Sequence, residues 1–105
     1  MSTVTVFGAG AWGSTMAQVL SDAGNDVLLW GRSKDVIAEI NSAHTNKKYL
    51  GKHELPLSLQ ATTDLAQAFA HSHIYVLAIP AQQLRLTLEE WKPFFSTDSI
   101  IVSTL

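Results

Sequence analysis

The sequence predicts an α/β fold built on a doubly wound parallel sheet, and three observations support that prediction. Short apolar runs alternate along the chain with segments that are apolar at helical spacing. The short runs are apolar almost throughout, as expected of strands that helices cover on both faces. Three glycines lie between the first apolar run and the first helical segment, where such a chain must turn sharply.

The first half of the chain predicts two strands and two helices. Residues 4–7 are short, apolar and followed by Gly8, which favours a buried strand. A helix at 11–23 has apolar residues at helical spacing and a natural stop at Gly24. A second strand is expected at 26–30. A second helix is expected from 34 to about 43, with Ser33 placed to cap it.

Residues 44–62 predict a long excursion between elements, because this segment has no sustained period and contains Gly51 and Pro56. A short strand near Leu59 is the one regular element considered there. Loops of this length are uncommon in compact domains and often carry function.

The second half of the chain predicts a short helix, a strand, a helix and a last strand. The expected elements are a helix from 63 or 64 to 70, a strand at 74–79, a helix at 82–91 and a strand at 99–103. Pro80 and Pro93 end the strand and the second helix, since proline cannot continue either element. The chain finishes on a strand of the kind that normally lies buried in the middle of a sheet. We therefore expect an incomplete domain, which has about four main strands and lacks a further part.

The composition fits one small globular domain. Of the 105 residues, 47% are hydrophobic and 15% are charged, which is enough apolar material for a core. The net charge of −2 gives no general attraction to nucleic acid or to anionic membranes. No cysteine is present, which excludes thiol chemistry. No membrane span or signal peptide is recognised, so we expect a cytoplasmic protein.

The glycine cluster is a G-x-G-x-x-G motif made by Gly8, Gly10 and Gly13. The first glycine permits a tight turn, the second lets a diphosphate approach the backbone, and the third lets helix and strand pack closely. The motif follows a strand and opens a helix within a β-α-β unit of about 30 residues, the context that a dinucleotide site requires. We therefore expect a Rossmann-type domain whose helix N-terminus holds a diphosphate.

The end of the second strand favours NADP over NAD. An NAD site usually has an acidic residue about 20 residues after the motif, accepting from the ribose 2′-hydroxyl. Here the strand ends in Trp30, Gly31 and Arg32, without a carboxylate. Arg32 is suited to pair with a 2′-phosphate or to stack on adenine.

Two further residues are candidates for the walls of the site. Trp12 lies inside the glycine loop. Its ring would cover the diphosphate, form a wall on the substrate side, or pack against the protein without a role in binding. Pro80 ends the third main strand, where ligands of open α/β sheets bind, and would form an apolar ledge near the nicotinamide or merely stop the strand. No nucleophile–base pair, metal cluster or other catalytic residue is recognised in the chain.

The chain resembles the bacterial NAD(P)-dependent glycerol-3-phosphate dehydrogenases over essentially its whole length. The segments that carry the resemblance are GAGAWGS, VLLWGRS, the spaced residues Asn46, Tyr49, Leu50, Leu55 and Pro56, then ATTDLAQA and VLAIPAQQLR. The glycine loop is common to many families, whereas W-G-R-S and the Y-L…L-P loop are more specific. The resemblance implies an N-terminal cofactor-binding Rossmann domain followed by a helical substrate domain that lies outside residues 1–105.

The resemblance also implies an activity and a set of contacts. The enzyme would reduce dihydroxyacetone phosphate to sn-glycerol 3-phosphate, a phospholipid precursor, using NADP or NAD, and would act as a possible homodimer. Together with the motif, the implied cofactor contacts are Gly8, Gly10, Ala11, Trp12, Gly13, Arg32, Ser33, Tyr49 and Pro80. The family's functional lysines would follow Leu105, so the chain alone is expected to be inactive.

Two other classes of protein share this layout. One is a different two-domain reductase, of the ketopantoate reductase or β-hydroxyacid dehydrogenase type. The other is a non-enzymatic Rossmann module that senses a nucleotide and acts on a partner. Such a module normally completes its sheet and commonly ends its second strand in an acid, so the incomplete sheet and Arg32 count against it.

Overall fold

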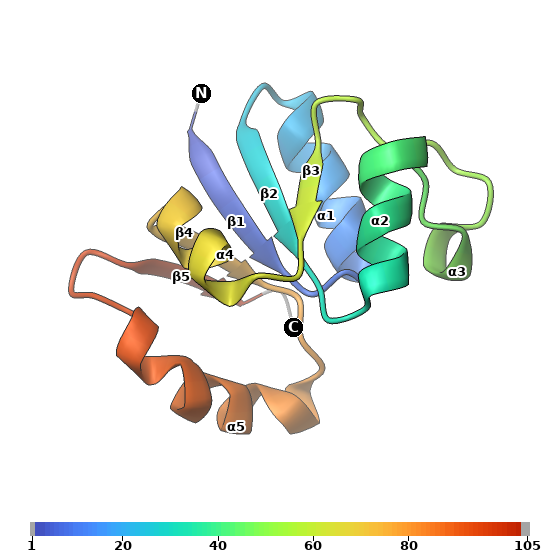
Figure 1. Cartoon of the computed structure of the whole chain (residues 1–105). Coiled ribbons are helices and arrows are strands. Elements are labelled where there is room, and N and C mark those ends of the chain that lie inside the picture. Colours follow the sequence, from blue (N-terminus) through green and yellow to red (C-terminus); the bar gives the residue numbers. More distant parts are fainter. Residues whose placement is uncertain (1, 104–105) are drawn as a thin grey trace.

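Five parallel strands form one sheet in the order β3-β2-β1-β4-β5 (Figure 1). The structure is a computed structural model and describes residues 2–103. The strands are β1 (Thr3–Phe7), β2 (Asp26–Trp30), β3 (Gln60–Thr62), β4 (Ile74–Leu77) and β5 (Ile100–Ser103). The chain winds outward from β1 on one side and then returns to build the other side, which confirms the predicted doubly wound fold.

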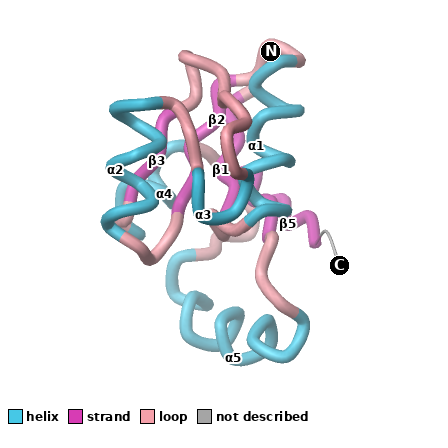
Figure 2. The backbone as a smooth tube through the Cα atoms, turned by 90° about the vertical axis from the view of Figure 1, so that its right-hand side faces the viewer, coloured by secondary structure: helices cyan, strands magenta, loops and turns pink. Residues whose placement is uncertain are grey.

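Helices cover both faces of the sheet and its carboxyl edge (Figures 1 and 2). They are α1 (Ala11–Asp22), α2 (Lys34–Ala43), α3 (Lys47–Leu50), α4 (Leu65–His71) and α5 (Ala81–Trp91), the last followed by the 3₁₀ turn η1 (Lys92–Phe94). Helices α1 and α2 lie on one face and α4 on the other, while α5 lies beyond the carboxyl ends of the strands. Within residues 2–103, no helix is long and apolar enough to cross a membrane.

The pleat of the strands divides the core into two clusters. Val4 and Val6 of β1 point to the face covered by α1 and α2, where they pack with Ile40 of α2. Phe7 points to the opposite face, toward α4 and α5. Successive side chains of a strand alternate between faces, so an apolar strand supplies both clusters at once.

The second cluster is aromatic and fixes the place of α5. Trp91, at the end of α5, is 1% exposed. Its ring centroid lies 4.9 Å from that of Phe7 and 5.2 Å from that of Trp30, which it meets edge to face at 89°. Phe69 of α4 adds a further contact to Phe7 at 4.8 Å. Burial of such large rings is strongly stabilising, so the cluster holds α5 across the ends of β1 and β2.

The predicted helix signals are confirmed. The Ser33 hydroxyl accepts a hydrogen bond from the Val36 amide at 3.3 Å and caps α2. The Asp64 carboxylate, which was not predicted as a cap, accepts from the Ala66 amide at 2.9 Å and caps α4 in the same way. Gly24, just after α1, has a φ of +94°, a conformation that glycine adopts without strain.

The excursion at 44–62 contains more regular structure than the sequence predicts. It includes the single helical turn α3, an antiparallel bridge between Thr45 and Glu54, and the strand β3. The short strand expected near Leu59 is therefore a full member of the sheet, paired with β2. The helix α3 and the bridge were not predicted, because tertiary contacts rather than local periodicity stabilise such short elements.

The predicted end of one strand is wrong. The strand expected at 74–79 ends at Leu77, because β1 alongside it ends at Phe7 and offers no further partner. The helix expected at 82–91 does end at Trp91, and the chain then continues into the separate turn η1 with Pro93 in its first turn. Proline is tolerated there because the first amides of a helix have no helical acceptor.

We predict that truncating Leu59 will destabilise the fold and that truncating Leu57 will not. Leu59 is 2% exposed in the cluster under α1 and α2, whereas Leu57, two residues earlier, is 79% exposed. Leu59→Ala should lower the free energy of unfolding by about 2–5 kcal/mol, and Leu57→Ala by no more than about 0.5 kcal/mol. Urea denaturation of the two variants measures this, and equal losses would contradict the described core.

Candidate functional site

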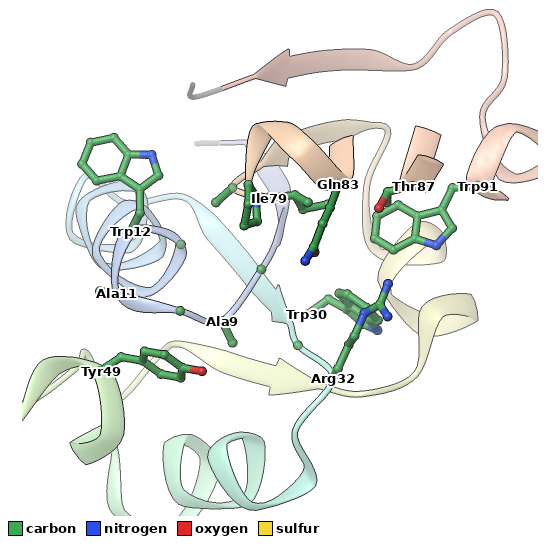
Figure 3. A pocket seen from close by; sticks show the side chains of 16 residues that line it. Ala9, Ala11, Trp12, Trp30, Arg32, Tyr49, Ile79, Gln83, Thr87 and Trp91 are labelled. Carbon is green, nitrogen blue, oxygen red and sulfur yellow. The ribbon is translucent and has the colours of Figure 1, made fainter. Parts of the chain in front are cut away.

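A pocket of about 690 Å³ opens at the carboxyl ends of β1, β2 and β4 (Figure 3). Its walls come from the glycine loop, the end of β2, α3, and the segment from β4 into α5. The lining residues are Gly8, Ala9, Gly10, Ala11, Trp12, Gly13, Trp30, Gly31, Arg32, Tyr49, Ala78, Ile79, Pro80, Gln83, Thr87 and Trp91. The pocket lies where the strand order reverses, between β1 and β4, which is where open α/β sheets bind ligands.

Gly8 and Gly13 are glycines because the backbone leaves no room for a side chain. Gly8 has a φ of +115°, and a Cβ there would lie 2.4 Å from the Ala78 carbonyl oxygen. A Cβ on Gly13 would lie 1.6 Å from the Gly8 carbonyl oxygen. The first glycine thus permits the turn and the third permits α1 to pack on the end of β1, as the motif predicts.

Gly10 is different, because packing does not require it. Apart from its two neighbours in the chain, no described residue has an atom within 4 Å of the position a Cβ would take, and its φ of −75° suits any residue. Gly10 lines the pocket. The missing side chain therefore leaves space on the pocket side of the backbone, where a ligand can approach the peptide groups directly.

The amides of residues 10–13 are free to bind an anion. The first hydrogen bond of α1 runs from the Ser14 amide to the Gly10 carbonyl at 3.0 Å, and within the described chain no acceptor meets the amides of 10–13. All four residues line the pocket. Free amides at a helix start, aligned with the helix dipole, form an anion site.

The end of β2 supplies the one positively charged side chain among the described residues that line the pocket. Arg32 is exposed, and its guanidinium carbon lies 5.9 Å from the centre of the Trp30 ring, within the range of a cation–π contact (Figure 3). No aspartate or glutamate is among the described residues that line the pocket. The electrostatics therefore favour an anionic ligand at this end as well as at the glycine loop.

Two exposed aromatic side chains flank the glycine loop. Trp12 is 54% exposed and Tyr49 is 45% exposed, and Figure 3 shows them on either side of the backbone that carries Ala9 and Ala11. Large apolar side chains at the rim of a pocket are available for contact with a ligand.

The loop that carries Tyr49 is tied to α2 through Glu39. The carboxylate accepts hydrogen bonds from the Thr45 hydroxyl at 2.6 Å and from the Lys47 amide at 2.9 Å. The Thr45 bond, followed by the Lys47 amide, lowers the pKa of Glu39 below its ordinary value. Because the pKa of Glu39 is lower in the folded chain than in the unfolded one, its ionised carboxylate stabilises the fold. This contribution to stability is complete at neutral pH and is lost as the pH falls through the folded pKa.

The pocket brings together all of the sequence-predicted cofactor residues except Ser33. That residue caps α2 and does not line the pocket. Gly31, where a Cβ would lie 2.6 Å from the Ala9 side chain, was not predicted to line the site. Gln83 and Thr87, which line the pocket from the same side of α5 as Trp91, were not predicted either. Their spacing of four residues is the signal that would have indicated a common helix face.

The fold and the pocket together define a Rossmann-type α/β domain with a pocket at the glycine loop. Residues 3–105 match the family described as the NAD-dependent glycerol-3-phosphate dehydrogenase N-terminus, and the chain belongs to that family.

Individual relatives agree with this membership. The chain is 46% identical, over 103 residues, to a glycerol-3-phosphate dehydrogenase [NAD(P)+] of Corynebacterium jeikeium, covering 98% of this chain and 31% of the relative. It is also similar to the crystal structure of a glycerol-3-phosphate dehydrogenase from Coxiella burnetii, with a TM-score of 0.86 at 26% identity over 96% of this chain and 31% of that one. A yeast glycerol-3-phosphate dehydrogenase matches with a TM-score of 0.88 at 29% identity, over 98% of this chain and 33% of that one.

The chain thus spans about a third of the length of the relatives it matches. Across residues 2–103, no group of three or more histidine, cysteine, aspartate or glutamate side chains is placed to hold a metal ion.

We predict that two alanine substitutions within the glycine motif differ in their effect on stability. Gly13→Ala places a Cβ against the Gly8 carbonyl and forces α1 away from β1, so it should lower the free energy of unfolding by about 3 kcal/mol or more. Gly10→Ala adds a Cβ in open space and should leave stability within about 0.5 kcal/mol. Denaturant unfolding of both variants measures this. A Gly13→Ala variant as stable as Gly10→Ala would refute the close packing described for this corner.

Proposed function

We propose that the chain is the cofactor-binding part of an oxidoreductase that interconverts dihydroxyacetone phosphate and sn-glycerol 3-phosphate with NAD(P)H. The observation that carries this proposal is the row of free amides at residues 10–13 facing a pocket, in a chain that belongs to this family. Glycerol 3-phosphate is the backbone precursor of membrane phospholipids, which gives the activity its role.

The residues present fit a dinucleotide. The free amides would hold the diphosphate, and the open space at Gly10 lets it approach them. Trp12, Tyr49 and Pro80 wall the pocket around the glycine loop. When bound, the cofactor would supply the hydride, while the protein supplies binding, orientation and electrostatics.

Arg32 supports a preference for NADP over NAD. It follows β2, at the position where an NAD site usually presents a carboxylate to the ribose 2′-hydroxyl. Its guanidinium is exposed beside the Trp30 ring and has no carboxylate partner among residues 2–103. We propose that it pairs with the 2′-phosphate of NADP, since guanidinium groups bind phosphate through paired charge-assisted hydrogen bonds.

Arg32→Ala should therefore weaken the binding of NADPH about tenfold while changing the affinity for NADH less than threefold, because one charge-assisted contact is lost from NADPH alone. Fluorescence titration of the chain with each cofactor measures this. Arg85→Ala is the matched control, since Arg85 is exposed on α5 and does not line the pocket. If the chain binds NADH and NADPH equally and Arg32→Ala changes neither affinity, the preference for NADP is wrong.

We also propose that residues 1–105 form a partial Rossmann domain within a longer enzyme that has a helical substrate domain. The relatives are about three times as long as this chain. Three apolar side chains of the edge strand β5, Ile100, Ile101 and Val102, are 51%, 45% and 44% exposed, which suits a surface that further structure covers. Cytoplasmic location and homodimer formation remain predictions of the sequence.

Tyr49 is the one described lining residue of a type that commonly serves as a general acid, and we propose that it does not donate the proton for carbonyl reduction. Reduction of a ketone to an alcohol requires a proton as well as a hydride, and general acids within reach of the carbonyl supply it. No histidine, lysine, aspartate or glutamate is among the described lining residues. We propose that the proton donor and the groups that bind the substrate phosphate belong to the longer enzyme.

The purified 105-residue chain should therefore bind NADPH but fail to oxidise it in the presence of dihydroxyacetone phosphate. The expected absorbance change at the NADPH band is no faster than in a control without protein. A fluorescence titration of the same sample establishes that the cofactor is bound. Sustained, protein-dependent turnover by this chain would contradict the proposed division of labour, and absence of dinucleotide binding would contradict the proposed function itself.

A further inference from the structure

Asn46 is a buried polar residue that joins the loop before α3 to the glycine loop. It is 0% exposed. Its side-chain amide donates one hydrogen bond to the Ala9 carbonyl and another to the Ser14 hydroxyl, both at 3.0 Å. Ser14 is itself fully buried. Residues far apart in the sequence are thus tied together beneath the glycine loop, on a side that does not line the pocket.

The Ala9 carbonyl is held on this inner side. Besides the bond from Asn46, it accepts a longer one from the Ser14 hydroxyl at 3.4 Å. Neither donor is a lining residue of the pocket. The carbonyl therefore points from the glycine loop into the protein and away from the space where a ligand would lie.

The direction of this carbonyl decides the direction of the next amide. The peptide between Ala9 and Gly10 is trans, and in a planar trans peptide the C=O and N–H bonds point in opposite directions. With the Ala9 carbonyl turned inward, the Gly10 N–H is turned outward to the pocket, and it has no acceptor within the described chain. Because Gly10 has no side chain, its own backbone preferences do little to keep this peptide in place.

We propose that Asn46 is a positioning residue that fixes the Gly10 amide toward the diphosphate site, an inference that rests on the proposed function. Asn46 does not touch the pocket and acts through the Ala9–Gly10 peptide. An amide that already points at an anion binds it more tightly than one that must first reorient, because reorientation subtracts from the binding free energy.

Asn46 also places Tyr49. Its backbone carbonyl accepts hydrogen bonds from the amides of Tyr49 at 3.2 Å and Leu50 at 2.7 Å, which form the single turn of α3. The same residue thus holds the glycine loop through its side chain and the aromatic wall of the pocket through its main chain. The two parts of the site keep a fixed relation to each other for this reason.

The hydrogen bonding of Asn46 is incomplete in a way that fits a positioning role. Both side-chain N–H groups are used, but the side-chain oxygen is buried and has no hydrogen-bond partner within residues 2–103. A buried acceptor without a partner destabilises a protein. Maximal stability is therefore not what this asparagine provides, and the two N–H donors are the groups that the site uses.

The test compares ligands with and without a diphosphate. In Asn46→Ala both donors are lost, and in Asn46→Asp the shape is kept but a carboxylate replaces the donors. Both variants should bind NADH and ADP about tenfold more weakly than the unchanged chain, and bind adenosine within about twofold of it, because one charge-assisted hydrogen bond to the diphosphate is lost. Affinities are measured by fluorescence for NADH and by NMR titration for ADP and adenosine.

Asn25 provides a matched control. Its side chain accepts from the Ser2 amide and donates to the Leu20 carbonyl, both at 3.0 Å, in the turn between α1 and β2 at the amino end of the sheet. Asn25→Ala therefore also removes two hydrogen bonds of a partly buried asparagine. It should lower the melting temperature while leaving the affinities for NADH, ADP and adenosine unchanged.

A second measurement needs no ligand. In the unchanged chain the ¹⁵N–¹H signal of Gly10 should be narrow, and in Asn46→Asp relaxation dispersion should show exchange of this peptide on the microsecond to millisecond scale. Ser14→Ala, which keeps the bond between Asn46 and Ala9, should show less exchange and a smaller loss of affinity. If Asn46→Ala does not fold, the comparison of Asn46→Asp with Ser14→Ala tests whether Asn46 positions the Gly10 amide.

The outcomes separate the two proposals. If the unchanged chain binds neither NADH nor ADP, the proposed function fails, and the exchange measurement alone decides the role of Asn46. If the chain binds both and folded Asn46 variants bind them equally well, the inference about Asn46 fails and the proposed function stands. An equal loss for adenosine and ADP overturns the inference too, since it indicates a general structural role.

Discussion

The contact between the first turn of α1 and the end of β1 is the constraint on which the rest of the site depends. Without a side chain at Gly13, the helix packs directly against the Gly8 carbonyl. This contact brings the free amides of residues 10–13 to the carboxyl edge of the sheet, beside the reversal of strand order. The helix dipole, the free amides and the open space at Gly10 then act at the same point, and this arrangement suits the doubly charged diphosphate that we propose the loop holds.

The remaining walls of the pocket are extensions of the hydrophobic core. Phe7, Trp30 and Trp91 form the aromatic cluster that holds α5 across the strand ends, and two of these rings also line the pocket. The Trp30 indole N–H donates to the Thr63 carbonyl at 3.1 Å, which satisfies its polar atom and fixes the ring. The surface beside Arg32 is therefore rigid, and a ligand there meets a wall that burial has already ordered.

The third wall comes from a segment without strong local structure. Two sets of hydrogen bonds hold residues 44–50 at the site. The Glu39 carboxylate of α2 accepts from Thr45 and Lys47, and the Asn46 side chain donates to the Ala9 carbonyl beneath the glycine loop. We propose that a site assembled in this way binds and orients a dinucleotide, and that the proton donor for chemistry on a substrate belongs to the longer enzyme. That division agrees with a chain that corresponds to about a third of its relatives.

The sequence by itself determined the alternation of strands and helices, the helix caps and the glycine corner, because periodicity, capping and backbone sterics act over a few residues. It also placed Arg32 at the end of a strand. Only the tertiary structure decided that Ser33 lies outside the pocket, that Thr87 shares a wall with Trp91, and that Asn46 lies beneath Ala9. These facts depend on contacts between residues far apart in the chain, and no local pattern encodes which distant partner a side chain will meet.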